Sequence, residues 1–222
     1  PQQYWLVPGN KLSVERYDSF FYCPDLHDMY KQIQEAKDNG EIDVIEGSSL
    51  NRRQKLTHTQ KTQLKESDED FKYIEIGDVT KYGLITKYIQ GKFEDLPTRG
   101  EYQIHTGDIL LALNNSSRGT VVLIPPEFDK AICTSGFLVI TPENKEHGLL
   151  LWYALRSEIC RKQIYYLAQT ASQPELKIDS WNTYFKIPIP IGEDCDKAIK
   201  KAKEFYKHLA KLTDVDSYRF SL

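Results

Sequence analysis

The sequence feature that most constrains the fold is a series of short runs of β-branched and aromatic residues from Phe71 to Ile140, with turn residues between them. Such runs are typical of β-strands, and their close spacing favours antiparallel neighbours over alternating strand–helix units. We therefore predict an α+β fold built on a curled, mostly antiparallel β-sheet. The predicted strands are Phe71–Ile76, Leu84–Ile89, Asp108–Leu113, Thr120–Ile124 and Gly136–Thr141.

Helices are expected to flank this sheet, because apolar residues recur at helical spacing on both sides of it. One helix is predicted over residues 26–39 and a second over 149–168. A last helix over 196–212 carries six lysines, most of them opposite an apolar stripe. The segment 181–191 contains Ile187-Pro188-Ile189-Pro190, and we expect it to be extended at a sheet edge, since proline cannot donate a hydrogen bond to a neighbouring strand.

Composition narrows the class of protein. With 222 residues, 40% of them hydrophobic and 27% charged, the chain can bury a core. Its longest apolar run, residues 148–155, is too short to span a bilayer. The four cysteines are widely spaced without a C-x-x-C pair, which excludes a disulfide scaffold and a cysteine-rich zinc site. We expect a cytoplasmic protein without a membrane segment.

The net charge of −3 does not by itself indicate a nucleic-acid partner, but the charges are unevenly distributed. Residues 1–46 hold four basic and nine acidic side chains, whereas residues 47–65 hold five basic and no acidic ones. The segment 197–222 is also basic. Two basic segments can form a local positive face, and ordinary surface patchiness explains the charges equally well. Residues 47–65 lack apolar periodicity and are predicted to be a long polar loop.

Motifs that would indicate a catalytic chain are missing from the sequence. It contains no G-x-x-x-x-G-K-[ST], no G-x-G-x-x-G and no G-x-S-x-G, and its five histidines form no metal-binding pattern. Pro125-Pro126 is flanked by Ile124 and Glu127, which lack the amide and aromatic groups with which amino-methyltransferases hold a flipped base. We expect no catalytic residue, no metal and no cofactor in this chain.

One enzyme interpretation stays open as an alternative, a Mg²⁺-dependent nuclease of the PD…ExK type that uses Asp25, Glu35 and Lys37. In such nucleases the two carboxylates converge on the metal, with E-x-K on a strand. The predicted helix over 26–39 would separate them by nearly three turns, about 15 Å. A strand at 33–38 would therefore be needed for this alternative.

The polar stretches of the sequence carry the side chains of a recognition surface. Arginine, asparagine, glutamine and serine can read base edges, whereas lysine and arginine contact phosphates. The candidates on the base-reading side are Arg52, Arg53, Gln63, Asn114, Asn115, Ser116, Ser117, Arg118, Ser172 and Gln173. The candidate phosphate contacts are Lys55, Lys61, Lys92, Arg99 and Lys177. For each loop taken alone, a solvated surface connection is an equally good interpretation.

Several segments also follow one another in a distinctive order: Phe71–Val79, Gly107–Ala112, Ala131–Pro142, Leu150–Ser157, and Ser172-Gln173-Pro174 with the later Ile187-Pro188-Ile189-Pro190. Arg16-Tyr17-Asp18, Tyr22 and Pro24 precede them. This order resembles the target-recognition domain of the specificity subunits of type I restriction-modification systems, over about residues 12–212. A departure is that one recognition unit is present, where the full subunit has two, each followed by a long helix.

The resemblance implies a non-catalytic subunit that reads one half of a split site in double-stranded DNA. It would hold an adenine methyltransferase on that DNA, and in complete systems a restriction subunit with motor activity. S-adenosylmethionine is then expected in the methyltransferase and not in this chain. The resemblance also divides the chain into a recognition domain at 1–193 and a spacer helix at 194–222, which would pair with a second helix in coiled-coil fashion and can form a dimer. The alternative is that this helix docks on its own domain.

Two questions stay open at this point. Because the chain begins at Pro1, we expect a piece of a longer polypeptide, and a fragment of a two-domain subunit, a half-size subunit that dimerises and a tail fused to its methyltransferase all fit. The second function class is a protein-interaction domain without DNA readout, in which residues 47–65 and the last helix bind a partner protein.

Overall fold

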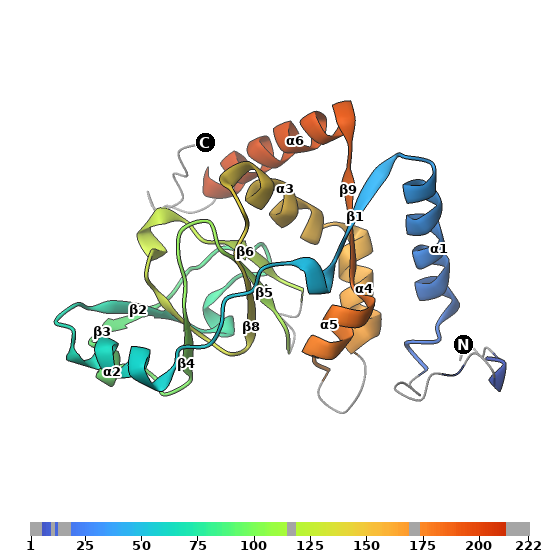
Figure 1. Cartoon of the computed structure of the whole chain (residues 1–222). Coiled ribbons are helices and arrows are strands. Elements are labelled where there is room, and N and C mark those ends of the chain that lie inside the picture. Colours follow the sequence, from blue (N-terminus) through green and yellow to red (C-terminus); the bar gives the residue numbers. More distant parts are fainter. Residues whose placement is uncertain (1–5, 10–11, 13–18, 115–118, 169–173, 212–222) are drawn as a thin grey trace.

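The computed structural model describes residues 6–9, 12, 19–114, 119–168 and 174–211, and its elements form an α+β fold (Figure 1). The helices are α1 (Pro24–Asp38), α2 (His58–Glu66), α3 (Lys145–Leu155), α4 (Glu158–Ala168), α5 (Ile178–Tyr184) and α6 (Gly192–Lys211). The strands are β1 (Ile42–Glu46), β2 (Phe71–Ile74), β3 (Ile89–Gly91), β4 (Gly100–Gln103), β5 (Ile109–Ala112), β6 (Val121–Leu123), β7 (Ile132–Thr134), β8 (Phe137–Ile140) and β9 (Lys186–Pro190). Within these ranges no helix is both long and apolar enough to cross a membrane.

The strands form three small sheets. One sheet has the order β3-β2-β7-β4, another has the order β6-β5-β8, and β1 pairs with β9. The strand pairs are antiparallel apart from β2 and β7, which run parallel. The prediction of an α+β fold with mostly antiparallel sheets is therefore confirmed.

The three-stranded sheet is buried on both faces, which explains its uninterrupted apolar sequence. Alternate residues of a strand point to opposite faces. In β5, Ile109 and Leu111 belong to the core shared with the helices, whereas Leu110 and Ala112 belong to the core shared with the four-stranded sheet. A strand that is covered on both sides needs apolar residues at every position.

The other face of the four-stranded sheet is covered by α2. Phe71, Tyr73 and Ile132 are buried there and pack with Leu56 and Leu64, the latter from α2. The molecule is thus layered, with α2 at one end, two sheets in the middle, and the remaining helices at the other end (Figure 1).

On the helical side, the β1–β9 ribbon is fixed by a buried glutamine. Gln163 of α4 donates from Nε2 to the carbonyl oxygen of Lys186 at 2.7 Å, and its Oε1 accepts from the amide nitrogen of Lys186 at 2.8 Å. The side-chain amide thereby satisfies both backbone groups at the start of β9. The Ile-Pro-Ile-Pro segment forms the edge strand β9, as predicted. The residues before it were expected to be extended from 181 onward and instead form α5, in which Trp181 is buried.

Three further predictions of secondary structure are wrong. Residues 47–65 are not one loop, because α2 occupies their second half. The single helix over 149–168 is two helices, and the Oγ of Ser157 accepts from the amide of Cys160 at 3.3 Å to begin the second. The strand predicted over 84–89 is wrong over residues 84–88, because the chain folds back there in a turn in which the Thr80 amide donates to the Leu84 carbonyl at 2.8 Å, and the strand β3 begins only at Ile89.

Three strands were missed: β1, β4 and β7. β4 has the sequence Gly-Glu-Tyr-Gln and is only half-buried along most of its length, so it shows no apolar alternation. β7 has three residues, too few for a periodic pattern. Each of these strands pairs with a strand that lies far away in the sequence. They therefore become strands only when the sheets assemble.

The last helix, α6, packs on α3 of its own domain. Ala202, Tyr206 and Leu209 are buried in the same core as Trp152 of α3, whose ring centroid lies 5.4 Å from that of Tyr206. The guanidinium of Arg156 lies over the Trp152 ring, 5.0 Å from its centroid, and burial lowers the pKa of Arg156 to about 10. The sequence left open the alternative that this helix docks on its own domain, and α6 does so. Much of the region predicted as a separate spacer (194–222) therefore belongs to the main core. Pairing with a second helix stays a prediction.

The turn before β3 supplies a test of the fold. Gly83 has φ +79°, and a Cβ at this position would lie 2.1 Å from the Val121 carbonyl oxygen. Gly83→Ala is expected to lower the free energy of unfolding by about 2–3 kcal/mol, because both the backbone angle and the contact oppose a side chain. Urea denaturation measures this loss, with Gly77→Ala as the control, since a Cβ at Gly77 meets nothing within 4 Å. Equal stability of the two variants would contradict the strained turn.

Candidate nucleic-acid interface

The basic segment before α2 is held along the edges of two sheets. The amide of Thr141 donates to the Asn51 carbonyl at 2.9 Å, and the amide of Arg53 donates to the Val139 carbonyl at 3.0 Å. Farther along, the amide of Leu56 donates to the Glu101 carbonyl at 2.7 Å. We call residues 51–57 the basic arm. Its backbone is thus hydrogen-bonded to strands of both sheets, which fixes the path of the chain through the arm.

A buried ion pair anchors this arm. Arg53 donates from Nε and Nη2 to the two carboxylate oxygens of Asp108, at 2.9 and 3.0 Å. Asp108 is only 2% exposed, and it also accepts from the His105 amide at 2.8 Å and from the Thr141 hydroxyl at 3.1 Å. Arg53, predicted as a base reader, is therefore assigned a structural role, because its guanidinium is committed to a buried carboxylate.

Helix α2 begins at a capping box that the sequence already contains. The Thr57 Oγ1 accepts from the Gln60 amide at 3.3 Å, and the Gln60 Oε1 accepts from the Thr57 amide at 2.9 Å. Thr-x-x-Gln is the signature of this motif, so it could have revealed the helix. The helix carries Lys61 and Gln63, and Gln63 lines an open pocket of about 390 Å³ with Gln103 and Lys130.

The lysines predicted to contact phosphates lie beside carboxylates. Lys61 and Lys55 flank Glu101 of β4, with N–O distances of 3.5 and 3.8 Å. Lys92 pairs with Asp70 at 3.3 Å and also donates to the Asp68 carbonyl. Lys177 pairs with Glu175. In the free protein the positive charge of each of these lysines is therefore partly balanced.

The two predicted arginines Arg52 and Arg99 differ from these lysines. Arg52 is half-buried in the basic arm, where it forms a β-bridge with Ile140, and Arg99 is exposed in the turn before β4. Among the residues that the structure describes, neither guanidinium has a carboxylate within ion-pair distance. Among the cationic candidates that the structure describes, these two arginines are thus the most available to an anionic ligand.

A second group of predicted residues lies where two loops meet. Asn114 forms a β-bridge with Glu175, and the Leu176 amide donates to the Leu113 carbonyl at 2.8 Å. The candidates next to these positions lie outside the described residues, and they are Asn115, Ser116, Ser117, Arg118, Ser172 and Gln173. The bridge brings together Asn114 and Glu175, two positions that lie far apart in the sequence.

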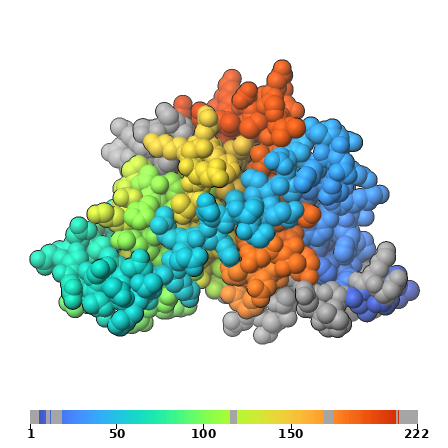
Figure 2. Space-filling view, in the orientation of Figure 1, coloured from blue at the N-terminus to red at the C-terminus, as the bar shows by residue number. Residues whose placement is uncertain are grey.

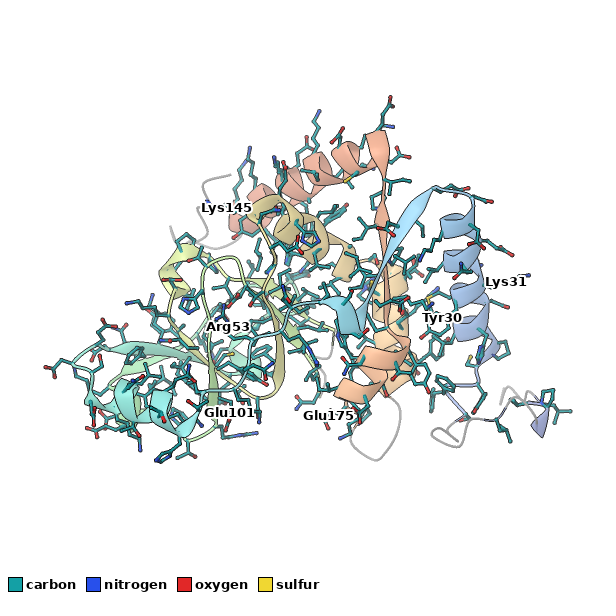
Figure 3. The ribbon with its side chains drawn as sticks, viewed as in Figure 1. Tyr30, Lys31, Arg53, Glu101, Lys145 and Glu175 are labelled. Carbon is teal, nitrogen blue, oxygen red and sulfur yellow. The ribbon has the colours of Figure 1, made fainter. Side chains whose placement is uncertain are left out.

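Figure 3 shows Glu101 and Glu175 toward the same lower edge, while Lys145 of α3 is at the top. Figure 2 shows the lobe with α2 and β3 at the end of the molecule away from α1. The predicted contact residues that the structure describes thus come from more than one loop, since they include residues of α2 and Asn114, which bridges to Glu175.

The nuclease alternative is not supported by the positions of its carboxylates. Asp25 and Glu35 both lie on α1, so they are separated by nearly three turns, and residues 33–38 are helical. Asp25 accepts a hydrogen bond from the Tyr166 hydroxyl at 3.0 Å. In the described part of the chain, no group of three His, Cys, Asp or Glu side chains is placed to hold a metal ion.

Comparison with known proteins gives structural matches. No family model matches the chain, and no curated protein does. Among solved structures, the HsdS subunit from Thermoanaerobacter tengcongensis matches with a TM-score of 0.58 and 19% identity, over 78% of this chain and 44% of that chain. A structure described under complex assembly and conformational transition of the type I restriction-modification system matches with a TM-score of 0.57 and 22% identity, over the same shares of the two chains.

The chain has the fold of a type I specificity-subunit recognition domain. The specificity-subunit fold that the order of sequence segments predicted is thereby confirmed. The chain spans less than half the length of these two solved chains.

Proposed function

We propose that this chain is a DNA sequence-recognition module of a restriction-modification system. It reads one half-site of double-stranded DNA and positions an adenine methyltransferase, and in complete systems a restriction subunit, on that DNA. The observation that carries the proposal is the specificity-subunit fold. The chain itself would be non-catalytic, and S-adenosylmethionine would be bound by the methyltransferase.

Recognition would use two kinds of contact. Lys55, Lys61, Lys92, Arg99 and Lys177 would contact phosphates and fix the register of the domain on the duplex. The base readers would be Arg52, Asn114, Gln63 and the neighbouring side chains outside the described residues. Each bidentate contact in the major groove would contribute about 1–3 kcal/mol of discrimination.

A protein-interaction domain without DNA readout is the second candidate function. The observation that favours it is the pairing of the predicted phosphate lysines with carboxylates, which lowers their net attraction for a polyanion. The two functions differ in salt dependence, because counterion release makes DNA affinity fall steeply with salt.

Selection of randomised duplex DNA at low salt tests the proposal. The chain is used alone and then with its methyltransferase partner, because affinity in such assemblies is shared among subunits. Enrichment of a short motif that is lost at higher salt would support sequence readout and identify the half-site. If neither format enriches a motif, the protein-interaction function is favoured.

Single substitutions separate the two kinds of contact. Lys61→Ala is expected to weaken binding to all sequences alike and to make the slope of log K against log salt shallower, by less than the value of about 0.9 for a full phosphate contact, because Glu101 already weakens the contact that is lost. Arg52→Ala is expected to relax preference at one base pair, at a cost of about 1–3 kcal/mol on the preferred site. Fluorescence anisotropy on the selected site and on a scrambled duplex measures both. If both variants changed affinity equally on the two duplexes, Arg52 would not be a base reader.

A further inference from the structure

We propose that Glu101 limits the sequence-independent affinity of this domain for DNA by competing with phosphate groups for Lys55 and Lys61. This inference rests on the proposed function. It assigns a role to an acidic residue that the motif analysis did not single out.

The geometry places one carboxylate between two ammonium groups. Oε1 of Glu101 lies 3.5 Å from Nζ of Lys61, and Oε2 lies 3.8 Å from Nζ of Lys55. The two lysines come from different elements, α2 and the basic arm, and Glu101 comes from β4. Because the Leu56 amide donates a hydrogen bond to the Glu101 carbonyl, the arm stays beside this carboxylate.

Lys55 and Lys61 could exchange the Glu101 carboxylate for a phosphate group, whereas the Arg53–Asp108 ion pair that anchors the arm would stay in place. Both distances exceed those of a direct charge-assisted hydrogen bond, and 57% of Lys55, 29% of Lys61 and 26% of Glu101 are exposed. Ion pairs of this kind are weak, since water and salt screen them. The Arg53–Asp108 pair is bidentate at 2.9–3.0 Å on a carboxylate that is 2% exposed, so DNA would not displace it.

A phosphate that approached Lys55 and Lys61 would meet the Glu101 carboxylate at the same place. Two like charges a few ångströms apart repel, and two ammonium groups that share a carboxylate offer less net charge to DNA. The wild-type domain would therefore gain less affinity from these two lysines than two unpaired lysines would give, on DNA of any sequence. Lys92 beside Asp70 and Lys177 beside Glu175 each pair with a single carboxylate, so their charges are also partly balanced.

The test is the isosteric variant Glu101→Gln in the full chain, compared with the wild type on a fluorescein-labelled duplex of mixed sequence over a range of salt concentrations. We expect affinity to rise about threefold to tenfold at low salt, and the salt slope to become steeper by up to about 1, because the lysines are released to phosphate. Glu146→Gln is the matched control. It removes the same charge from a pair with Lys203 at 3.3 Å, between α3 and α6.

The outcomes separate this inference from the proposed function. If the wild type binds DNA and Glu101→Gln binds no tighter than Glu146→Gln, the role of Glu101 is wrong while DNA recognition stands. If neither the wild type nor Glu101→Gln binds duplex DNA, alone or with the methyltransferase, both are overturned. Thermal unfolding checks that the variants are folded, and Glu101→Ala, which also removes the charge, should show the same gain.

Discussion

Replacing Asp108 with asparagine is expected to lower the free energy of unfolding by about 3–5 kcal/mol, as does the removal of one partner from a buried ion pair. The carboxylate accepts four hydrogen bonds, two of them from Arg53, and lies almost completely out of water. An amide cannot accept from all four donors, and it leaves the guanidinium without its counter-charge. Urea denaturation followed by circular dichroism measures the change.

The control for this variant is Asp38→Asn at the exposed end of α1, where Gln34 donates to Oδ1, an atom that asparagine retains. It should change stability by less than about 0.5 kcal/mol. If Asp108→Asn were as stable as this control, the buried pair would not anchor the basic arm. Because Arg53 is the residue of the arm that is tied to Asp108, the variant should also weaken DNA binding in any assay where the wild type binds.

Replacing Trp181 with alanine is expected to cost about 3–5 kcal/mol, the usual loss for a buried tryptophan. Its ring is fully buried and stacks on Phe185 with 4.3 Å between centroids, and its Nε1 donates to the Gly47 carbonyl at 2.8 Å. The contact is so close that a Cβ on Gly47 would lie 2.3 Å from the Trp181 carbonyl oxygen. Trp181 thus joins α5 to the chain segment that leads into the basic arm.

Trp181→Phe separates the contribution of ring packing to this loss of stability from that of the hydrogen bond to Gly47. Phenylalanine keeps an aromatic ring against Phe185 but cannot donate to Gly47, and an unpaired buried carbonyl costs about 1–3 kcal/mol. Denaturation of both variants should therefore rank wild type above Trp181→Phe and Trp181→Ala below both. A phenylalanine variant as stable as the wild type would mean that the hydrogen bond contributes nothing.

Local patterns were enough for much of the fold. The helix α1, the strands β5, β6 and β8 and the α+β class follow from apolar spacing, because each of these elements carries its own pattern of buried residues. The end of the helix after Leu155 is different. There a single turn at Arg156 and Ser157 separates two helices, although their combined apolar pattern is that of one continuous helix.

In the candidate site, too, some features could be predicted from the sequence and others could not. The residue types expected of a DNA reader were visible in the sequence, and so was the Thr57–Gln60 capping signature that starts α2. Which of the cations are committed to carboxylates was not visible, because Arg53 and Asp108 are 55 positions apart and meet across sheet edges. The proximity of Asn114 to Glu175 depends in the same way on a long-range bridge.

The sequence by itself determined the fold class and the family to which the fold is similar, because these depend on residue type, spacing and order. Only the tertiary structure decided that the last helix docks on α3, that Arg53 is an anchor and that Glu101 lies between two lysines. The physical reason is that an ion pair or a docked helix face depends on distances between residues far apart in the chain, and those distances exist only after the sheets have formed.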